Sequence, residues 1–233
     1  MKILALDSTA KTASVSICED DRLITVYSVT AGLNHSETLL PMVENALKTA
    51  QMNIDDIDMF AISDGPGSFT GVRIGVSLLK GLAFSKNKIC VGVSTLESLA
   101  YNLVGFDGII CPVMDARRDQ VYNALFSFEN GEMKRLCDDR AISISELEKE
   151  LEKTDRNIYL CGDGYDVAKN GMNIKVCNTP TLLREQNAYS VAQTALKKYK
   201  QNKDGNFTDL ELKPTYLRVP QAERERLEKL NNN

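Results

Sequence analysis

Apolar and polar residues alternate in short runs at the start of the chain, and longer helical periods follow them. A period of two is typical of half-buried strands, whereas apolar residues three and four positions apart form one face of a helix. In the first part of the chain, these patterns predict strands at 2–7, 13–18, 22–29, 57–63 and 88–93. They predict helices at 36–50, 70–84 and 95–104. The order of elements indicates a mixed sheet with helices packed on it.

The pattern starts again near residue 108, and we therefore expect two related halves. The second part is predicted to have strands at 108–115, 120–128, 157–161 and 174–177, and helices at 143–152 and 188–200. We expect an α/β fold of two ribonuclease-H-like halves, with residues 1–105 as the N-terminal half and 106–219 as the C-terminal half. Residues 220–233 are rich in Glu, Arg and Lys and are expected to form a charged tail.

Composition narrows the class of protein. Hydrophobic residues make up 43% of the 233 residues, which is typical of a globular chain. The longest apolar runs fall far short of the ~20 residues that a membrane helix needs, and the run before Asp7 is too short for a signal peptide. A net charge of −4 argues against a broad nucleic-acid surface. We expect a cytoplasmic protein with no membrane contact, whose six cysteines are mostly buried thiols.

One glycine-rich segment stands between a predicted strand and a predicted helix. Its candidate phosphate-binding residues are Gly65, Gly67, Ser68, Thr70 and Gly71. Glycines allow the backbone to approach a ligand closely, and a helix start offers free N–H groups to an anion. The segment matches neither a Walker A loop nor a dinucleotide fingerprint. A phosphate cradle and a tight structural turn therefore both stay open.

The helix predicted at 70–84 is apolar over an arc of about 200°, roughly twice the usual stripe. One face, which suits a sheet, holds Val72, Val76, Leu79 and Ala83. The other face holds Gly71, Ile74, Gly75, Leu78 and Leu82. Its glycines form a groove for another helix, which is either the helix at 36–50 or a second protein. In the helix at 36–50, Pro41 is expected near the first turn, where a missing N–H costs least.

Residues for catalysis are few. His35 is the one histidine of the sequence, so a site with two histidines is excluded, and no nucleophile elbow is present. We assign no catalytic residue and no metal ligand. Asp7, at the end of the first strand, is either a turn residue or a group that holds a magnesium-bound water. The segment 162–164 (Gly-Asp-Gly) is either a turn or a point of approach to an adenine ring.

Taken together, five segments are more specific than each alone. They occur in the order 4–9, 34–37, 65–83, 115–122 and 214–218. In this combination the chain closely resembles the TsaB (YeaZ) family, the dimerisation subunits of the bacterial machinery that makes threonylcarbamoyladenosine (t6A) in tRNA. The resemblance covers essentially the whole chain. It implies an actin/Hsp70/sugar-kinase-like architecture.

The resemblance also implies partners. In this family the subunit binds TsaD, which transfers the threonylcarbamoyl group to adenosine 37 of tRNAs that read codons starting with A, and the ATPase TsaE joins the pair. We therefore expect a non-catalytic subunit that reaches tRNA only through the complex, and that forms a homodimer when TsaD is absent. The expected contact residues are Leu40, Val43, Leu47, Ile74, Gly75, Leu78 and Leu82.

The resemblance places the chain apart from the catalytic relatives. TsaD-like proteins carry a His-x3-His metal pair, and the matching positions here are Thr95 and Leu99. A hydroxyl and an isobutyl group do not chelate a metal. Thr9 stands where sugar kinases have a glycine, so we expect no independently bound cofactor. ATP or ADP at the junction between subunits stays open.

Two enzyme readings compete with this one. A small-molecule kinase or ATPase of the same fold would use Asp7, the loop at 65–71 and the turn at 162–164. A glycoprotease-like peptidase is poorly supported by a chain with a single histidine. Direct contact with tRNA through Arg117, Arg118 and the tail residues Arg224 and Arg226 is a further alternative, although the net charge gives it little support.

Overall fold

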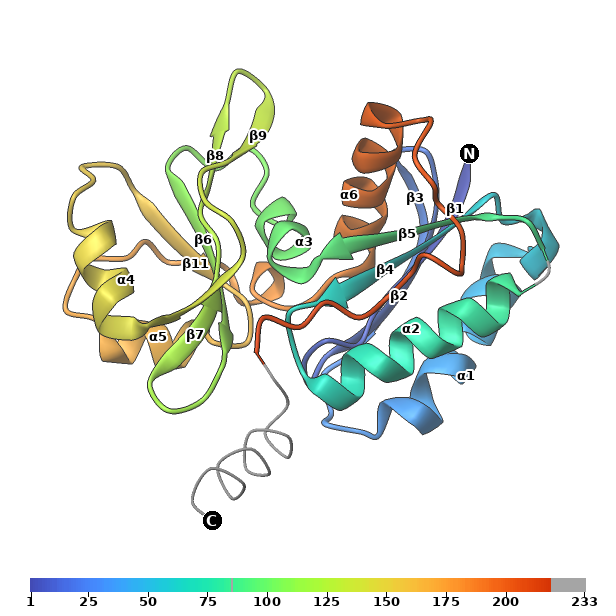
Figure 1. The fold of residues 1–233 in the computed structure, drawn as a ribbon, viewed down its shortest axis with the longest axis horizontal. Coiled ribbons are helices and arrows are strands. Elements are labelled where there is room, and N and C mark those ends of the chain that lie inside the picture. Colours follow the sequence, from blue (N-terminus) through green and yellow to red (C-terminus); the bar gives the residue numbers. More distant parts are fainter. Residues whose placement is uncertain (85, 219–233) are drawn as a thin grey trace, which may run out of the picture.

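The computed structural model describes residues 1–84 and 86–218, which form two halves side by side (Figure 1). The N-terminal half contains a five-stranded sheet in the order β3-β2-β1-β4-β5. Its strands are β1 (Lys2–Asp7), β2 (Ala13–Glu19), β3 (Arg22–Val29), β4 (Met59–Gly65) and β5 (Ile89–Ser94). The first three strands pair antiparallel, and β1, β4 and β5 are parallel.

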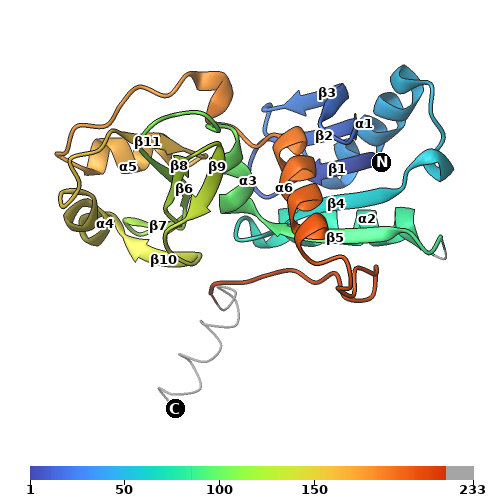
Figure 2. The same ribbon diagram turned by 90° about the horizontal axis from the view of Figure 1, so that it is seen from above.

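Helices cover both faces of this sheet (Figures 1 and 2). On one face, α1 (His35–Ala50) and α2 (Phe69–Ala83) pack over Leu4 and Leu6 of β1. On the other, α6 (Ala188–Gln201) packs over Ile3 and Ala5. Alternate residues of β1 thus enter two different cores, as the period of a strand requires. A short 3-10 turn, η1 (Ile54–Asp56), follows α1.

The start of α1 differs from expectation in one detail. The helix begins at His35 behind the N-cap Asn34, whose side chain accepts a hydrogen bond from the Ser36 N–H. Pro41 consequently lies in the second turn, just beyond the first turn near which it was expected. Pro41 and Glu37, whose carbonyl loses its helical partner, are both exposed. Water can satisfy that carbonyl, which explains why the helix tolerates the proline.

The C-terminal half repeats the strand order in reduced form. Its strands are β6 (Ile109–Asp115), β7 (Gln120–Asn123), β8 (Phe126–Glu129), β9 (Glu132–Arg135), β10 (Arg140–Ser143) and β11 (Ile158–Cys161). β6 pairs antiparallel with β8 and parallel with β11, and β8 pairs antiparallel with β9. These relations match those of β1 with β2 and β4, and of β2 with β3. The predicted α/β fold of two ribonuclease-H-like halves is confirmed.

Several elements of this half were predicted wrongly. The expected strand at 120–128 is two strands, because the buried Asn123 amide turns back to donate to the carbonyls of Pro112 and Ala124. The expected strand at 174–177 is a single bridge between Tyr159 and Cys177. Strands β9 and β10 and helix α5 (Tyr165–Gly171) were not expected from the sequence. Helix α4 (Ile144–Leu151) was expected. A second 3-10 turn, η2 (Thr181–Leu183), precedes α6.

The chain returns to the N-terminal half at its end. After α3 (Thr95–Tyr101), which lies between the halves, the chain builds the second sheet and then crosses back to form α6. Residues 208–218, which we call the strap, follow α6, and Leu212 of the strap is buried in the core under α2. The prediction that residues 106–219 form one half was therefore wrong for α6 and the strap, and the predicted tail at 220–233 lies outside the described residues.

Two properties of the described residues bear on the expected class of protein. No helix among residues 1–84 and 86–218 is long and apolar enough to cross a membrane. Four of the six cysteines are buried and the other two are half-buried. Burial raises the pKa of Cys18 and of Cys111 to about 12, so neither thiol is reactive at neutral pH.

Candidate functional site

The glycine-rich loop joins β4 to α2 and rests on the turn after β1. The backbone N–H of Ser68 donates to the carbonyl of Thr9 over 2.7 Å. The side chain of Ser68 is the N-cap of α2 and accepts from the Gly71 N–H. The loop is thus held by the chain's own backbone on one side and open on the other.

The predicted phosphate-binding residues fall into two groups. Gly67, Ser68 and Thr70 line an open cleft between the two halves. Gly65 and Gly71 do not, because a Cβ on Gly65 would collide with the carbonyl of Thr215, and one on Gly71 with the carbonyl of Ser8. These two glycines make room for the chain's own backbone. For Gly65 and Gly71 the contacts favour the tight structural turn, which the sequence left open beside a phosphate cradle.

Asp7 is a buried structural residue. It is 1% exposed, and its carboxylate accepts from the Thr9 N–H at 2.9 Å, the Thr9 hydroxyl at 2.8 Å and the Ser63 hydroxyl at 2.6 Å. Burial raises the pKa of Asp7, and these hydrogen bonds oppose the rise. The carboxylate joins β1 to β4, and Asp7 is not among the residues that line the cleft. These contacts favour the reading of Asp7 as a structural turn residue over the one in which it holds a magnesium-bound water.

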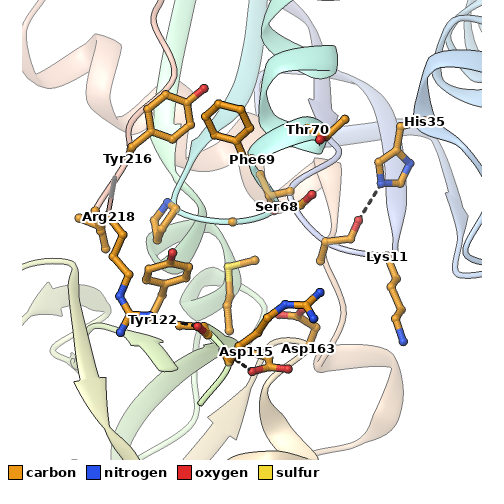
Figure 3. Close-up of a pocket in the computed structure, with 18 of the residues that line it drawn as sticks. Lys11, His35, Ser68, Phe69, Thr70, Asp115, Tyr122, Asp163, Tyr216 and Arg218 are labelled. Atoms are coloured by element: carbon orange, nitrogen blue, oxygen red, sulfur yellow. Dashed lines mark hydrogen bonds between the residues drawn. The ribbon is translucent and has the colours of Figure 1, made fainter. Parts of the chain in front are cut away.

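The cleft between the halves has a volume of about 700 Å³ (Figure 3). Charged and aromatic side chains come from both halves, and they include Lys11, His35, Phe69, Asp115, Arg117, Tyr122, Asp163, Tyr216 and Arg218. Phe69 and Tyr216 lie at one end of it and Asp115 and Asp163 at the other. The cleft thus offers aromatic faces at one end and carboxylates at the other.

The acidic end of the cleft contains a carboxyl group with a raised pKa, that of Asp163. The enclosing walls, followed by the negative charges of Asp115 and Glu185, raise the pKa of Asp163 to about 7, although part of this side chain stays exposed to solvent. The flanking glycines serve the chain's own packing: a Cβ on Gly162 would collide with the carbonyl of Val113. The turn reading of this segment is therefore the one that the structure supports.

The strap closes one side of the cleft. Its Tyr216 ring lies 4.9 Å from that of Phe69, and its hydroxyl accepts a 2.9 Å hydrogen bond from Nε of Arg73. The Arg73 guanidinium also stacks on Phe69, 4.1 Å from the ring centre. At the other end of the strap, Arg218 donates to the carbonyl of Ala116 at 3.0 Å. The strap therefore connects α2 to the turn between β6 and β7.

A second, smaller cavity lies between α1 and α2 on the outer surface of the N-terminal half. This groove has a volume of about 400 Å³ and is lined by His35, Ser36, Leu40, Arg73, Ile74, Ser77 and Leu78. Leu40 is 41% exposed, while Ile74 and Leu78 are half-buried. An open apolar groove between two helices has the shape that a third helix fills.

The groove contains some of the expected contact residues and not others. Leu40, Ile74 and Leu78 line it. Val43 is 1% exposed and belongs to the core, and Leu47 and Leu82 pack against that core. The prediction that Val43 is a contact residue was therefore wrong, because its side chain is buried in the core and a partner could not touch it.

Gly75 is the second correction. A Cβ at this position would collide with Oγ of Ser8 and lie 3.0 Å from Cδ1 of Ile62. The glycine thus allows α2 to lie close to the loop after β1, and it is buried there rather than in the groove. The prediction of a glycine-lined docking surface was wrong, because the apolar pattern does not tell which of two faces meets the sheet.

His35 and Arg73 connect the cleft and the groove. Neither was predicted as a site residue from the sequence. His35 lines both cavities, and its Nε2 lies 2.7 Å from the carbonyl of Ala10. Arg73 lines the groove and stacks on Phe69, which lines the cleft. The spacing of Phe69 and Arg73, four residues apart on a helix, is a signal that could have been used. No local sequence signal indicates the contact between Arg73 and Tyr216, because these two residues are 143 positions apart.

The two positions that the resemblance aligns with a metal pair are buried. Thr95 is 0% exposed and Leu99 is 1% exposed. Leu99 belongs to the apolar cluster between the halves, and its Cδ1 is close to Gly162. Within residues 1–84 and 86–218, no three His, Cys, Asp or Glu side chains gather in a way that could hold a metal ion. These residues provide packing in place of ligands.

Comparison with known proteins adds the family context. The model of a family described as "TsaD: tRNA N6-adenosine threonylcarbamoyltransferase" matches residues 26–226. The chain is 36% identical over 169 residues to the tRNA threonylcarbamoyladenosine biosynthesis protein TsaB of Bacillus subtilis (strain 168), with 72% of this chain and 74% of that protein covered. The TsaB protein of Escherichia coli (strain K12) is 36% identical over 134 residues, covering 56% and 58%. Among solved structures, YeaZ from Pseudomonas aeruginosa has a TM-score of 0.79 at 26% identity, covering 93% of this chain and 99% of that one.

Proposed function

Because the chain belongs to the TsaD family and matches its TsaB members over most of its length, we propose that it serves t6A formation in tRNA as a non-catalytic subunit. In this proposal it docks a TsaD-type threonylcarbamoyltransferase. The transfer of the threonylcarbamoyl group takes place on that partner. The tRNA is reached only through the complex.

The open groove between α1 and α2 carries the proposal. Leu40 exposes 41% of its surface there, beside Ile74 and Leu78. Covering apolar surface contributes roughly 25 cal/mol per Å² to association. An apolar groove of this kind on an otherwise charged surface is typical of a protein interface. In the absence of TsaD, the same groove would pair two copies of this chain as a homodimer.

The two positions that the resemblance aligns with a metal pair support a non-catalytic role. Thr95 and Leu99 are both buried, and Leu99 belongs to the apolar cluster between the halves. A site that needs two imidazoles has neither the ligands nor the space here. Asp7, on which a kinase reading would depend, is tied to Ser63 and Thr9. These observations favour a partner subunit as the place of the transfer chemistry.

Nucleotide and third-subunit binding stay part of the proposal. Gly67, Ser68 and Thr70 at the start of α2 face the cleft, next to the groove. A docked TsaD would therefore lie beside this loop, and ATP or ADP is proposed at that junction, with no cofactor held by this chain alone. A TsaE-type ATPase would join the assembled pair.

Reconstitution tests the proposal. The TsaD of the same organism, this chain, a TsaE-type ATPase, a tRNA transcript and threonylcarbamoyl-adenylate would be combined, and t6A measured by mass spectrometry of nucleosides. We expect t6A only when TsaD and this chain are both present. Formation of t6A by this chain without TsaD, or equal rates with and without this chain, would contradict the proposal.

A further inference from the structure

The groove has a charged residue at its edge that the apolar argument does not explain. Among the described residues that line it, Arg73 is the one Arg, Lys, Asp or Glu. Its Nε donates to the Tyr216 hydroxyl, and the flat face of the guanidinium stacks on Phe69. Among residues 1–84 and 86–218, no carboxylate lies within ion-pair distance of it. Within this part of the chain, no acceptor is found for the outer N–H groups of Arg73, which is an exposed residue.

The charged residues of α2, the helix that contains Arg73, are all basic. Its sequence contains Arg73 and Lys80 and no acidic residue. The ammonium group of Lys80 donates a hydrogen bond to the carbonyl of Leu212 at 3.2 Å. Lys80 keeps its positive charge but does not line the groove, so Arg73 is the basic residue of α2 that lies at the groove. A partner that brings a second positive charge to this point would be repelled.

A docked partner must replace the water that it removes. Once the groove is covered, the outer N–H groups of Arg73 lose their solvent, and a buried charge without a partner is strongly unfavourable. Carboxylates match the geometry of a guanidinium and can accept two parallel hydrogen bonds. Because Tyr216 and Phe69 already hold the guanidinium in place, little side-chain freedom is lost when such a pair forms.

We propose that the element that docks in the groove is an amphipathic helix of the TsaD-type partner that carries an Asp or Glu, and that this carboxylate pairs with Arg73. Its apolar side covers Leu40, Ile74 and Leu78, and its acidic residue stands at the edge where Arg73 lies. This inference rests on the proposed docking of TsaD. It adds the chemistry by which this face recognises that partner.

Charge substitutions at Arg73 test the pairing. The dissociation constant of the complex with TsaD would be measured by calorimetry, at low and at high salt, for the wild type, Arg73→Gln and Arg73→Glu. We expect Arg73→Glu to weaken binding at least about 30-fold, in line with charge pairs at interfaces. We expect the affinity of Arg73→Gln to lose most of the salt dependence seen in the wild type. Lys48→Glu, an equal charge change on an exposed residue of α1 outside the groove, is the matched control.

A charge swap identifies the carboxylate. Each Asp and Glu on the partner's docking helix would be changed to Lys, and one of these variants is expected to restore binding to Arg73→Glu. If Arg73→Glu binds TsaD as the wild type does while Leu40→Arg abolishes binding, the carboxylate pairing is overturned and the docking groove stands. If Leu40→Arg also binds normally, the groove itself is wrong. Loss of self-association alone in Arg73→Glu would assign the pairing to a second copy and would overturn the proposal. Circular dichroism verifies that each variant is folded.

Discussion

The Oγ atom of Ser8 occupies the space in which a side chain at Gly75 would stand. The same hydroxyl donates to the carbonyl of Gly71 over 2.9 Å. The turn after β1 is therefore in direct contact with α2. This contact sets the depth of α2 on the sheet, and with it the position of the groove on its outer side.

Substitution of Gly75 by Ala is expected to destabilise the protein. The added methyl would collide with Ser8, whose position is fixed by its bond to Gly71, and would lie 3.0 Å from Cδ1 of Ile62. Overpacking of this kind costs about 1–3 kcal/mol. The free energy of unfolding would be measured by urea denaturation.

Gly81 provides the matched control, because it lies in the same helix and a Cβ there meets nothing within 4 Å. Gly81→Ala is expected to stabilise the protein by about 0.5–1 kcal/mol, since alanine loses less conformational freedom in a helix. Equal effects of the two substitutions would show that α2 does not rest on Ser8.

The helices that form the groove could be predicted from the sequence. The ends of α1 and α2 agree within one residue with the periods of their apolar positions. The period of the apolar positions does not predict which residues of other elements each face of α2 contacts. Gly75 belongs to an apolar face that is free in a helical projection, and only the fold brings Ser8 beneath it.

Truncation of Leu212 tests whether the strap is part of the N-terminal core. Leu212 is 4% exposed and packs under α2, so Leu212→Ala is expected to lower the free energy of unfolding by about 2–4 kcal/mol. Leu210 lies two residues earlier in the strap and is 73% exposed. Leu210→Ala is therefore expected to stay within about 0.5 kcal/mol of the wild type. A small effect at both positions would mean that the strap does not contribute to the core.

The strap also marks the limit of what the sequence could reveal. Its residues have no helical or strand period, and their partners are far away in the chain, as with Tyr216 and Arg73. Assigning residues 106–219 to one half followed from their order in the sequence. The return of α6 to the first sheet depends on apolar contacts with Ile3 and Ala5 that no local pattern encodes.

The carboxylate of Asp163 is expected to make stability depend on pH. Its pKa is raised from an ordinary 3.8 to about 7 by the cleft walls and the nearby acidic residues. An acid with a raised pKa in the folded state binds its proton more tightly there than in the unfolded chain. Wild-type stability therefore falls as the pH rises between these two values.

Asp163→Asn removes this dependence, because an amide does not titrate. The variant is expected to be more stable than the wild type above pH 7, with a difference that shrinks toward zero near pH 4. Thermal unfolding across this range measures the effect. Asp166→Asn, an exposed position on α5, serves as the control. A stability difference for Asp163→Asn that does not change with pH would refute the assignment.

The central claim is that the groove between α1 and α2 binds a TsaD-type partner, and one pair of variants tests it most directly. Leu40 in the groove is 41% exposed and Leu23 on β3 is 44% exposed, so an arginine at either position should leave the fold intact. The affinity for TsaD would be measured by calorimetry for Leu40→Arg and Leu23→Arg. We predict that Leu40→Arg lowers the affinity at least about 100-fold, as expected when a charge enters an apolar interface, and that Leu23→Arg leaves it unchanged. Equal binding by Leu40→Arg and the wild type would contradict the account.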